Sequence, residues 1–494
     1  MSHCASVREH MGKGRTANAK SSLVRFRAPA FPLSRSYYRR LALLILVALS
    51  LLPGRYCLAG IGEQVYEEVL PNGLKLLLME NRKAPVVTFQ VWYRAGSRNE
   101  TWGKTGLSHM LEHMMFKGTE KVGPEEFSRV IQENGGNDNA FTSTDYTAYF
   151  TNISADRLRI PMELELDRMT NLRLRESDFR TERMVVMEER RLRTDDNPQA
   201  FLMEQVEAAA FQVQPYHWPV IGWMEDIRNY TLEDLKAYHG AFYGPANAFL
   251  VVVGDFKKDE VLPLIRKGFG AIPKGRTPDQ NKDKEEPQVG ERRVFVKREA
   301  QLPSILMGYH VPNLHNQDGY VLEIIEGILS SGTSSRLYRK LVRDKQLCLS
   351  VDADYSLVSR DPGLFYVSAQ LLPGKEVSEV EAALNEEIEK LQKELVPDGE
   401  LQKAKNQLEA SFVYGQDSLF YQAMLLAQHE IASSWRKIDD YIPSILKVSS
   451  ADIMRVAKQY LMPDNRTVGI LVPIPPVAGK PVPAGLPTRE RITR

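Results

Sequence analysis

The chain has 494 residues, which is too long for one hydrophobic core and predicts two or more domains. Hydrophobic residues make up 43% of it and charged residues 26%, as in ordinary globular proteins. A net charge of +1 argues against nucleic acid or an anionic surface as the main partner. Three cysteines are too few for a disulfide scaffold or a cysteine-rich zinc site.

Residues 1–59 form a predicted presequence. A basic stretch precedes a twelve-residue, almost wholly apolar core at residues 41–52, which suits a signal peptide and is shorter than the about 20 residues of a membrane span. Cleavage is expected after Ala59, and a lipid anchor at Cys57 is disfavoured by the bulky residues before it. We expect export, to a bacterial periplasm, with membrane contact only through this segment if it stays uncleaved. The long basic stretch keeps an organellar transit peptide, and hence the mitochondrial matrix, as an alternative.

From Tyr66 onward the pattern alternates between strand-like and helix-like segments. The first half predicts strands at 73–80 and 86–96, a helix from Leu107 with Gly118 as its stop, one strand over Asn139–Ser154, helices at 155–172 and 177–193, and a closing helix and strand up to Phe256. A linker rich in proline, glycine and charged residues follows. The second half predicts strands at 302–311 and 363–372 and helices at 319–329, 377–395 and 398–414.

The ends of the two halves match at a constant offset of 218 residues. In each copy a Ser/Thr cap opens a helix that ends at a Pro-x-Asn turn before a buried strand. The matching pairs are Thr231 and Ser449, Asp234 and Asp452, Pro245 and Pro463, and Asn247 and Asn465. We therefore predict an α+β fold of two homologous lobes, each a mostly antiparallel sheet packed with helices, facing each other across a clam-like cleft.

The predicted domain organisation follows from this repeat. It comprises a presequence (1–59), a first lobe (60–272), a linker (273–292), a second homologous lobe (293–475) and a Pro-rich tail (476–494). The helix of the second lobe that corresponds to the one from Leu107 reads "YVLEIIEGIL" and has no histidine. That asymmetry predicts one functional site per chain.

The stretch "GLSHMLEHMMFKGTE" (Gly106–Glu120) places His109, Glu112 and His113 on an otherwise apolar helix. Residues four apart share a helix face, so both imidazoles can approach one point with the carboxylate alongside. Hydrogen bonding within a core is the alternative, but three buried polar groups are hard to satisfy together. His-x-x-Glu-His is the inverted order of a common zinc motif, so we expect half of a zinc site.

A third ligand has to come from another segment. The helical pattern "RTERMVVMEERRLRTDDNP" carries Glu182, Glu188 and Glu189, and Glu182 and Glu189 share a face because they are seven residues apart. From the charge pattern alone these acids could equally be solvated partners of the nearby arginines.

"HMLEHMMFKGT" (His109–Thr119), followed by "ERMVVMEER" (Glu182–Arg190), closely resembles the pitrilysin/insulinase family of inverted-motif zinc peptidases. The stretches "YRAGS", "NAFTSTDYTAYF", "PYHWPVIGW" and "SSGTSSRLYRKLV" also resemble that family, and the resemblance spans about residues 62–475. A chain with two lobes is similar to bacterial processing-type peptidases and to the β subunit of the mitochondrial processing peptidase.

The resemblance implies a role for each polar residue. His109, His113 and Glu189 become ligands of one Zn²⁺ per chain, Glu112 the general base, and Glu182 the carboxylate that orients a ligating imidazole. A surface ion pair remains the alternative for Glu182. The implied activity is endopeptidase hydrolysis of peptides or unfolded polypeptide segments.

The resemblance also implies how substrate is held. Asn139, Ala140, Phe141 and Thr142 resemble the edge strand to which a peptide adds as a further strand, although an ordinary strand of the sheet is the alternative. In active members the second lobe often supplies an Arg and, seven residues on, a Tyr, which contact the substrate carbonyl region. Arg343 fits the Arg, but Ser350 stands where the Tyr would be. We therefore expect a homologous zinc-less partner subunit, or a homodimer, and keep a non-catalytic assembly subunit as the alternative function.

Overall fold

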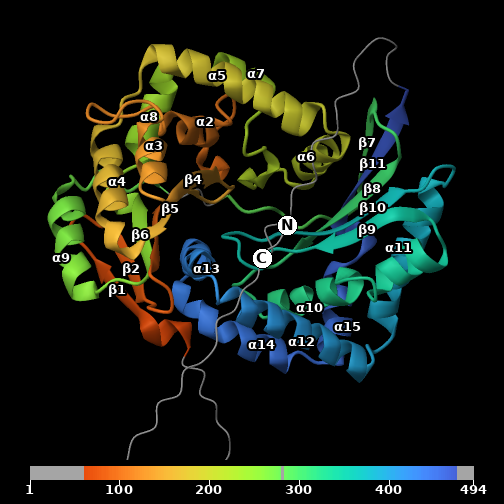
Figure 1. Ribbon diagram of the computed structural model, residues 1–494. Helices are drawn as coiled ribbons and strands as arrows, with labels where there is room; N and C mark the ends of the chain where they lie inside the picture. The colour runs from red at the N-terminus through yellow and green to blue at the C-terminus, as the bar shows by residue number, and fades with distance from the viewer. Residues whose placement is uncertain (1–59, 280–282, 476–494) are drawn as a thin grey trace, which may run out of the picture. The chain divides into compact units, whose positions relative to one another are not determined.

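The computed structural model describes residues 60–279 and 283–475, drawn in colour in Figure 1. The described residues fall within one compact unit. The predicted presequence and the Pro-rich tail lie outside them. No helix among the described residues is both long enough and apolar enough to cross a membrane.

The described strands form two sheets of mixed but mostly antiparallel pairing, as predicted. The first sheet has the order β1-β2-β6-β3-β5-β4, and only β2 and β6 pair in parallel. Its strands are β1 (Val65–Val69), β2 (Lys75–Glu80), β3 (Val86–Tyr93), β4 (Asn137–Thr142), β5 (Thr147–Ser154) and β6 (Ala248–Gly254). The second sheet has the order β7-β11-β8-β10-β9, with a single parallel pair, β7 and β11. Its strands are β7 (Arg292–Glu299), β8 (Ser304–Val311), β9 (Cys348–Asp354), β10 (Gly363–Leu371) and β11 (Arg466–Ile474).

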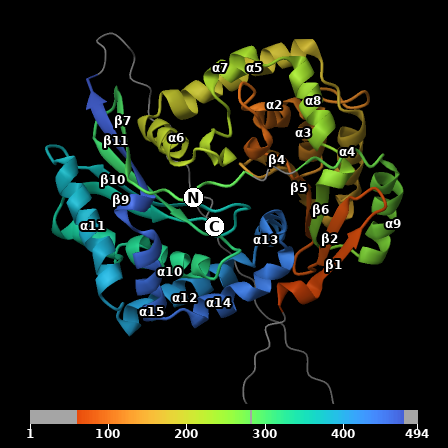
Figure 2. The same ribbon diagram turned by 180° about the vertical axis from the view of Figure 1, so that it is seen from behind.

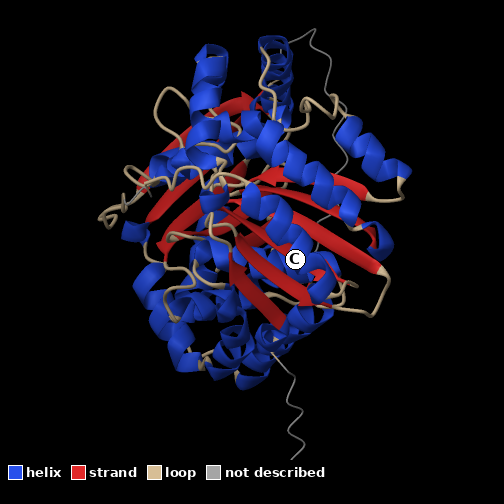
Figure 3. Ribbon diagram, turned by 90° about the vertical axis from the view of Figure 1, so that its left-hand side faces the viewer, coloured by secondary structure: helices blue, strands red, loops and turns tan. Residues whose placement is uncertain are grey.

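Helices cover these sheets, as the blue and red colouring of Figure 3 displays. The first half contributes α2 (Leu107–Met114), α3 (Glu126–Glu133), α4 (Arg159–Asn171), α5 (Glu176–Arg190), α6 (Pro198–Ala210), α7 (Met224–Asn229), α8 (Leu232–Phe242) and α9 (Lys258–Gly268). The second half contributes α10 (Asp318–Ser330), α11 (Val377–Lys393), α12 (Asp398–Gly415), α13 (Leu419–Ala432), α14 (Tyr441–Lys447) and α15 (Ser450–Tyr460).

The two halves repeat each other down to single hydrogen bonds. Capping boxes open α8 at Thr231 and α15 at Ser449. In the turn after each helix an asparagine amide donates to the helix's last carbonyls: Asn247 to Phe242 (2.9 Å) and Asn465 to Tyr460 (2.8 Å). The predicted repeat at the ends of the two halves is therefore present in the structure.

Each sheet also receives a helix from the other half of the chain. Leu202 and Val206 of α6 pack against Leu306 and Leu471 of the second sheet. A Cβ at Gly469 of β11 would lie 2.3 Å from Val206, so glycine is what allows α6 to approach this closely. Figure 1 and Figure 2 both place α6 beside β7 and β11.

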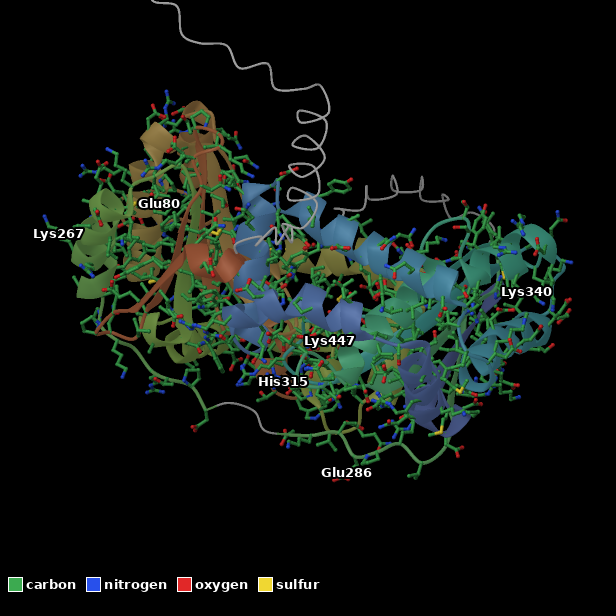
Figure 4. All side chains as sticks on the ribbon, turned by 90° about the horizontal axis from the view of Figure 1, so that it is seen from below. Glu80, Lys267, Glu286, His315, Lys340 and Lys447 are labelled. Carbon is green, nitrogen blue, oxygen red and sulfur yellow. The ribbon has the colours of Figure 1, made fainter. Side chains whose placement is uncertain are left out.

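Helix α13 makes the reciprocal contact with the first sheet. Its buried face, which includes Ala423 and Leu426, packs against Trp92 of β3 and Phe249 of β6. Nε2 of His315, labelled in Figure 4, lies 3.1 Å from the carbonyl of Ala432 at the end of α13. Because both faces of the first sheet are covered, strands such as β6 are apolar at every position.

One predicted element is wrong. Residues 139–154 do not form a single strand but a hairpin, with β4 and β5 joined by a turn at residues 143–146. Asp145 in this turn is 6% exposed and accepts hydrogen bonds from the Tyr216 hydroxyl (2.8 Å) and the Arg360 amide (3.0 Å). A buried carboxylate held by two distant segments fixes the chain reversal, which a local pattern does not reveal.

Candidate metal centre

Helix α2 is held at its N-terminus by a buried acid. Both carboxylate oxygens of Glu100 accept backbone hydrogen bonds, from Gly106 (2.6 Å) and from Ser108 (2.7 Å). Burial raises the pKa of Glu100 to about 8. Gly106 has a φ of +87°, and a Cβ there would lie 2.4 Å from the Ile221 carbonyl oxygen, so the helix can begin only at a glycine. These contacts fix where the side chains of α2 point.

Helix α5 packs against α2, above it in Figure 1, and brings two of the three candidate acids to it. Oε2 of Glu189 lies 3.6 Å from Nε2 of His109 and 3.3 Å from Nε2 of His113. Glu182 lies seven residues before Glu189 on the same face of α5, and its Oε2 is 3.2 Å from Nδ1 of His113. Glu188 instead points outward, is 57% exposed and pairs with Arg191.

His109, His113 and Glu189 each offer one ligand atom, and these atoms lie within 4.8 Å of one another. Ligands 2.0–2.2 Å from a tetrahedral zinc ion are roughly 3.3–3.6 Å apart, which agrees with the two measured separations. Two neutral imidazoles and one carboxylate are also a common set for catalytic zinc. The residues present therefore fit a zinc ion.

The two imidazoles differ in the contacts of Nδ1, the ring nitrogen that does not face Glu189. Nδ1 of His113 faces Glu182, whose other oxygen lies 2.6 Å from Nζ of Lys117. A carboxylate in this position fixes the ring orientation and favours metal binding through Nε2. Nδ1 of His109 is buried and has no hydrogen-bond partner among the described residues.

The electrostatics of the cluster follow from burial and mutual charge. Burial, reinforced by the neighbouring His113, lowers the pKa of His109 to about 4, which keeps that imidazole neutral. Burial alone would lower the pKa of His113, but the adjacent Glu189 and Glu182 raise it. Burial alone would raise the pKa of Glu189, but its contacts with the two imidazoles outweigh burial and lower that pKa.

Glu112 occupies the same face of α2. Burial raises the pKa of its carboxyl group. Oγ1 of Thr142, at the end of β4, donates to Oε2 of Glu112 at 2.5 Å. Thr142 was expected to contact substrate, and in this structure its hydroxyl orients the candidate base.

A cavity of about 1510 Å³ opens in front of these residues. Its lining includes the three polar residues of the inverted motif, the distant acid Glu189, the second acid Glu182 and the four strand residues expected to hold substrate: His109, Glu112, His113, Glu189, Glu182, Asn139, Ala140, Phe141 and Thr142. β4 is the last strand in the order of the first sheet, so one of its backbone edges is not paired within that sheet. The structure thus brings nine of the ten predicted site residues together.

Arg343 is the exception. It lies on a π-helical turn, η8 (Tyr338–Asp344), where its side chain is 55% exposed and pairs with the adjacent Asp344. It is absent from the described residues that line the cavity. On the same turn, Lys340 lies at the margin of the molecule in Figure 4 and pairs with Glu386.

Three cationic residues of the cavity were not predicted from the sequence, and one of them, Arg129, pairs with Glu126 and Glu133. Lys117 follows the motif directly and contacts Glu182. Arg193 contacts the second oxygen of Glu189 at 2.8 Å. The i,i+4 spacing of Glu189 and Arg193 could have signalled this pair, but many arginines in this segment offer the same spacing.

Comparison with known proteins agrees with this geometry. A family model described as Insulinase (Peptidase family M16) matches residues 75–222, and one described as Peptidase M16 inactive domain matches residues 229–408. The zinc protease PqqE of Helicobacter pylori is 35% identical over 415 residues, which cover 82% of this chain and 92% of that protein. An uncharacterized zinc protease of Mycobacterium leprae is 28% identical, and the match covers 94% of that protein.

Solved structures give the same result. The crystal structure of a protease from Helicobacter pylori matches with a TM-score of 0.80 at 33% identity, over 83% of this chain and 99% of that one. A putative M16-like peptidase from Alicyclobacillus acidocaldarius matches with a TM-score of 0.73 at 19% identity, over 83% of this chain and 98% of that one, and so shares the fold. Motif, architecture and relatives agree, and the chain belongs to the M16 (pitrilysin/insulinase) family of peptidases.

Proposed function

We propose that this chain is a zinc-dependent endopeptidase that hydrolyses peptides or unfolded polypeptide segments. The observation that carries the proposal is the convergence of His109, His113 and Glu189 on one point, with Glu112 beside them in a cavity. Relatives named zinc proteases support zinc over other metals.

The residues divide the chemistry between them. A bound zinc ion would act as a Lewis acid and lower the pKa of the attacking water toward about 7. Glu112 accepts the proton of that water and passes it to the leaving amine as the C–N bond breaks. Thr142 holds the Glu112 carboxylate by its hydrogen bond at 2.5 Å, and Glu182 holds the His113 ring.

The proposed substrate is an extended peptide. The open edge of β4 can pair with an added strand through backbone hydrogen bonds, which leave side-chain selectivity loose. A cavity of about 1510 Å³ is larger than the roughly 300–1,000 Å³ of small-molecule sites. Both features favour a polypeptide segment over a small ligand.

Glu112→Gln tests the proposal. The variant keeps the three ligands, so its zinc content by metal analysis should equal that of the wild type, whereas cleavage of an unfolded test protein should be lost. Glu188→Gln is the matched control, because Glu188 is exposed on α5 and pairs only with Arg191 among the described residues. Cleavage by Glu112→Gln at the wild-type rate would contradict the mechanism.

We also propose that the chain is exported and works with a homologous zinc-less subunit or a second copy of itself. Purification from the native host, with N-terminal sequencing of the mature chain and a mass measurement of the complex, tests both points. A monomer with full peptidase activity would exclude the partner, and an N-terminus at Met1 would contradict cleavage.

A further inference from the structure

Peptide hydrolysis places a negative charge on the scissile carbonyl oxygen, and a preorganised cation or donor usually stabilises it. Arg343, the second-lobe arginine expected to contact the substrate carbonyl region, is exposed, pairs with Asp344 and does not line the cavity. A charge close to His109, His113 and Glu189 therefore has to come from another residue. Of the three cationic residues that line the cavity, Lys117 holds Glu182 and Arg129 pairs with two glutamates of its own helix. The remaining candidate is Arg193.

Arg193 is presented by an unusual turn. Helix α5 ends at Arg190, and the next five residues form the π-helical turn η4 (Arg191–Asp195), closed by a hydrogen bond of 2.7 Å from the Asp196 amide to the Arg191 carbonyl. Within this turn Arg191 points outward to Glu188, whereas Arg193 turns into the cavity. Single π-helical turns are rare, and those that interrupt α-helices frequently occur at functional sites.

The turn is anchored by the residue that precedes it. Arg190 is 3% exposed and donates to both oxygens of Glu204 on α6, at 2.8 and 2.9 Å, and to the Gly222 carbonyl at 2.8 Å. A bidentate arginine–carboxylate pair of this kind is geometrically rigid. The backbone that carries Arg193 is therefore fixed relative to α5 and α6.

The guanidinium of Arg193 has more N–H donors than its ion pair with Glu189 uses. Nη1 of Arg193 lies 2.8 Å from Oε1 of Glu189, the oxygen that faces away from the two imidazoles. Among the described residues Glu189 is its one ion-pair partner, and the side chain is 59% exposed. An arginine has five N–H donors in a planar fork, so the remaining ones are available to a molecule in the cavity.

The charge of Arg193 also reaches the reacting groups. Its guanidinium contacts Glu189 and lines the same cavity as Glu112 and His109. Lys117, the other cation near the centre, instead holds Glu182.

We propose that Arg193 donates a hydrogen bond to the scissile carbonyl oxygen of the substrate and stabilises the charge that develops there. The inference rests on the proposed peptidase function. As the water oxygen bonds to the carbonyl carbon, the π electrons move to the carbonyl oxygen, next to the free N–H groups of Arg193. As the C–N bond breaks, those electrons return and the amine takes its proton from Glu112.

Arg193→Gln is the decisive variant, with Arg191→Gln as its matched control on the same turn. We expect kcat of Arg193→Gln to fall about 10²–10³-fold with KM changed only slightly, as for the loss of one oxyanion donor. Zinc content should equal that of the wild type, and Arg191→Gln should keep wild-type kcat. A readout independent of turnover is the affinity for a phosphinic peptide, whose anionic oxygens mimic the charged carbonyl, and it should fall about as much as kcat.

Three results would overturn the inference. They are an unchanged kcat in Arg193→Gln, an unchanged affinity for the phosphinic peptide, and a loss of zinc whose replacement restores activity, since the last would mean that Arg193 acts only by holding Glu189. Failure of the wild type itself to cleave, in the preparation purified from the native host, would reject the proposed function and this inference with it. Cleavage by the wild type and by Arg193→Gln at equal rates would reject this inference alone.

Discussion

Helices α2 and α10 occupy the same place in the two halves, yet only α2 carries metal-binding groups. Each packs against the capped helix of its own half, α2 against α8 and α10 against α15. Helix α10 is buried and apolar along most of its length, and its buried acid, Asp318, pairs with Arg455 and the Tyr460 hydroxyl. In α2, the imidazoles of His109 and His113 face an open cavity instead.

The neighbouring helix explains the difference. Helix α5 offers Glu182 and Glu189 to α2, whereas α12, which packs on α10, offers Leu401 and Ala404. A pair of imidazoles without these acids would be buried polar groups with no compensation. The repeated fold therefore sets where α2 and α10 lie. A metal site forms there only when the neighbouring helix also supplies acidic residues.

The largest expected effect comes from making α2 resemble α10. His113→Leu should lower zinc affinity by more than the about 10–100-fold typical of outer-shell losses, because a ligand is removed. It should also lower the free energy of unfolding of the metal-free protein, because Glu182 and Glu189 lose the imidazole that pairs with them. Competition with a chelator and denaturant titration measure the two quantities. Zinc affinity equal to that of the wild type would mean that α2, like α10, does not bind zinc through this position.

The next effect concerns the exchanged helices, which make the halves depend on each other. Leu426→Ala on α13 should cost about 2–5 kcal/mol of the free energy of unfolding, because Leu426 is fully buried against the first sheet. Amide hydrogen exchange should quicken in both sheets. Leu446→Ala, at an exposed leucine of α14, is the control and should cost within about 0.5 kcal/mol. Faster exchange in the second half alone would mean that the stability of the first sheet does not depend on α13.

A smaller, pH-dependent effect is expected where α6 crosses to the second sheet. Oε1 of Glu207 accepts a hydrogen bond from the Tyr366 hydroxyl at 2.9 Å, and burial raises the pKa of Glu207 to about 7. Because folding favours the protonated form, this group's contribution to stability is full below about pH 4.5 and is lost as the pH rises through 7. Glu207→Gln should therefore gain stability relative to the wild type between pH 5 and 8, by at most about 1.4 kcal/mol for each pKa unit. Denaturant titrations at both pH values measure it, and a pH-independent difference would count against the shift.

The smallest effect tests the equality of the repeat. Thr231→Ala and Ser449→Ala each remove the side chain of a capping box with the same geometry, 3.2 Å from hydroxyl to amide in both. Each should cost about 1 kcal/mol of the free energy of unfolding. Thermal or denaturant unfolding of the two variants provides the comparison. A cost confined to one of them would show that the copies have diverged in stability as well as in chemistry.

Much of this architecture could be predicted from the sequence. The offset of 218 residues located the capped helices, and the His109, Glu112 and His113 spacing located the centre, because both are local patterns with fixed geometry. The hairpin at Asp145 and the exchange of α6 and α13 could not be predicted, since apolar periodicity says that a face is buried but not against which sheet. Arg193 was missed because the π-helical turn that aims it into the cavity has no pattern distinct from a helix end.

The exchange of α6 and α13 has a consequence for synthesis of the chain. The first sheet is complete once β6 has left the ribosome at Gly254, but α13, which covers its second face, begins only at Leu419. At about 5–20 residues per second, the face around Trp92 and Phe249 stays uncovered for roughly 8–30 s. Nascent chains of this length therefore expose an apolar sheet that has no partner yet, and a chaperone or a rapid rate of elongation would protect it from aggregation during that interval.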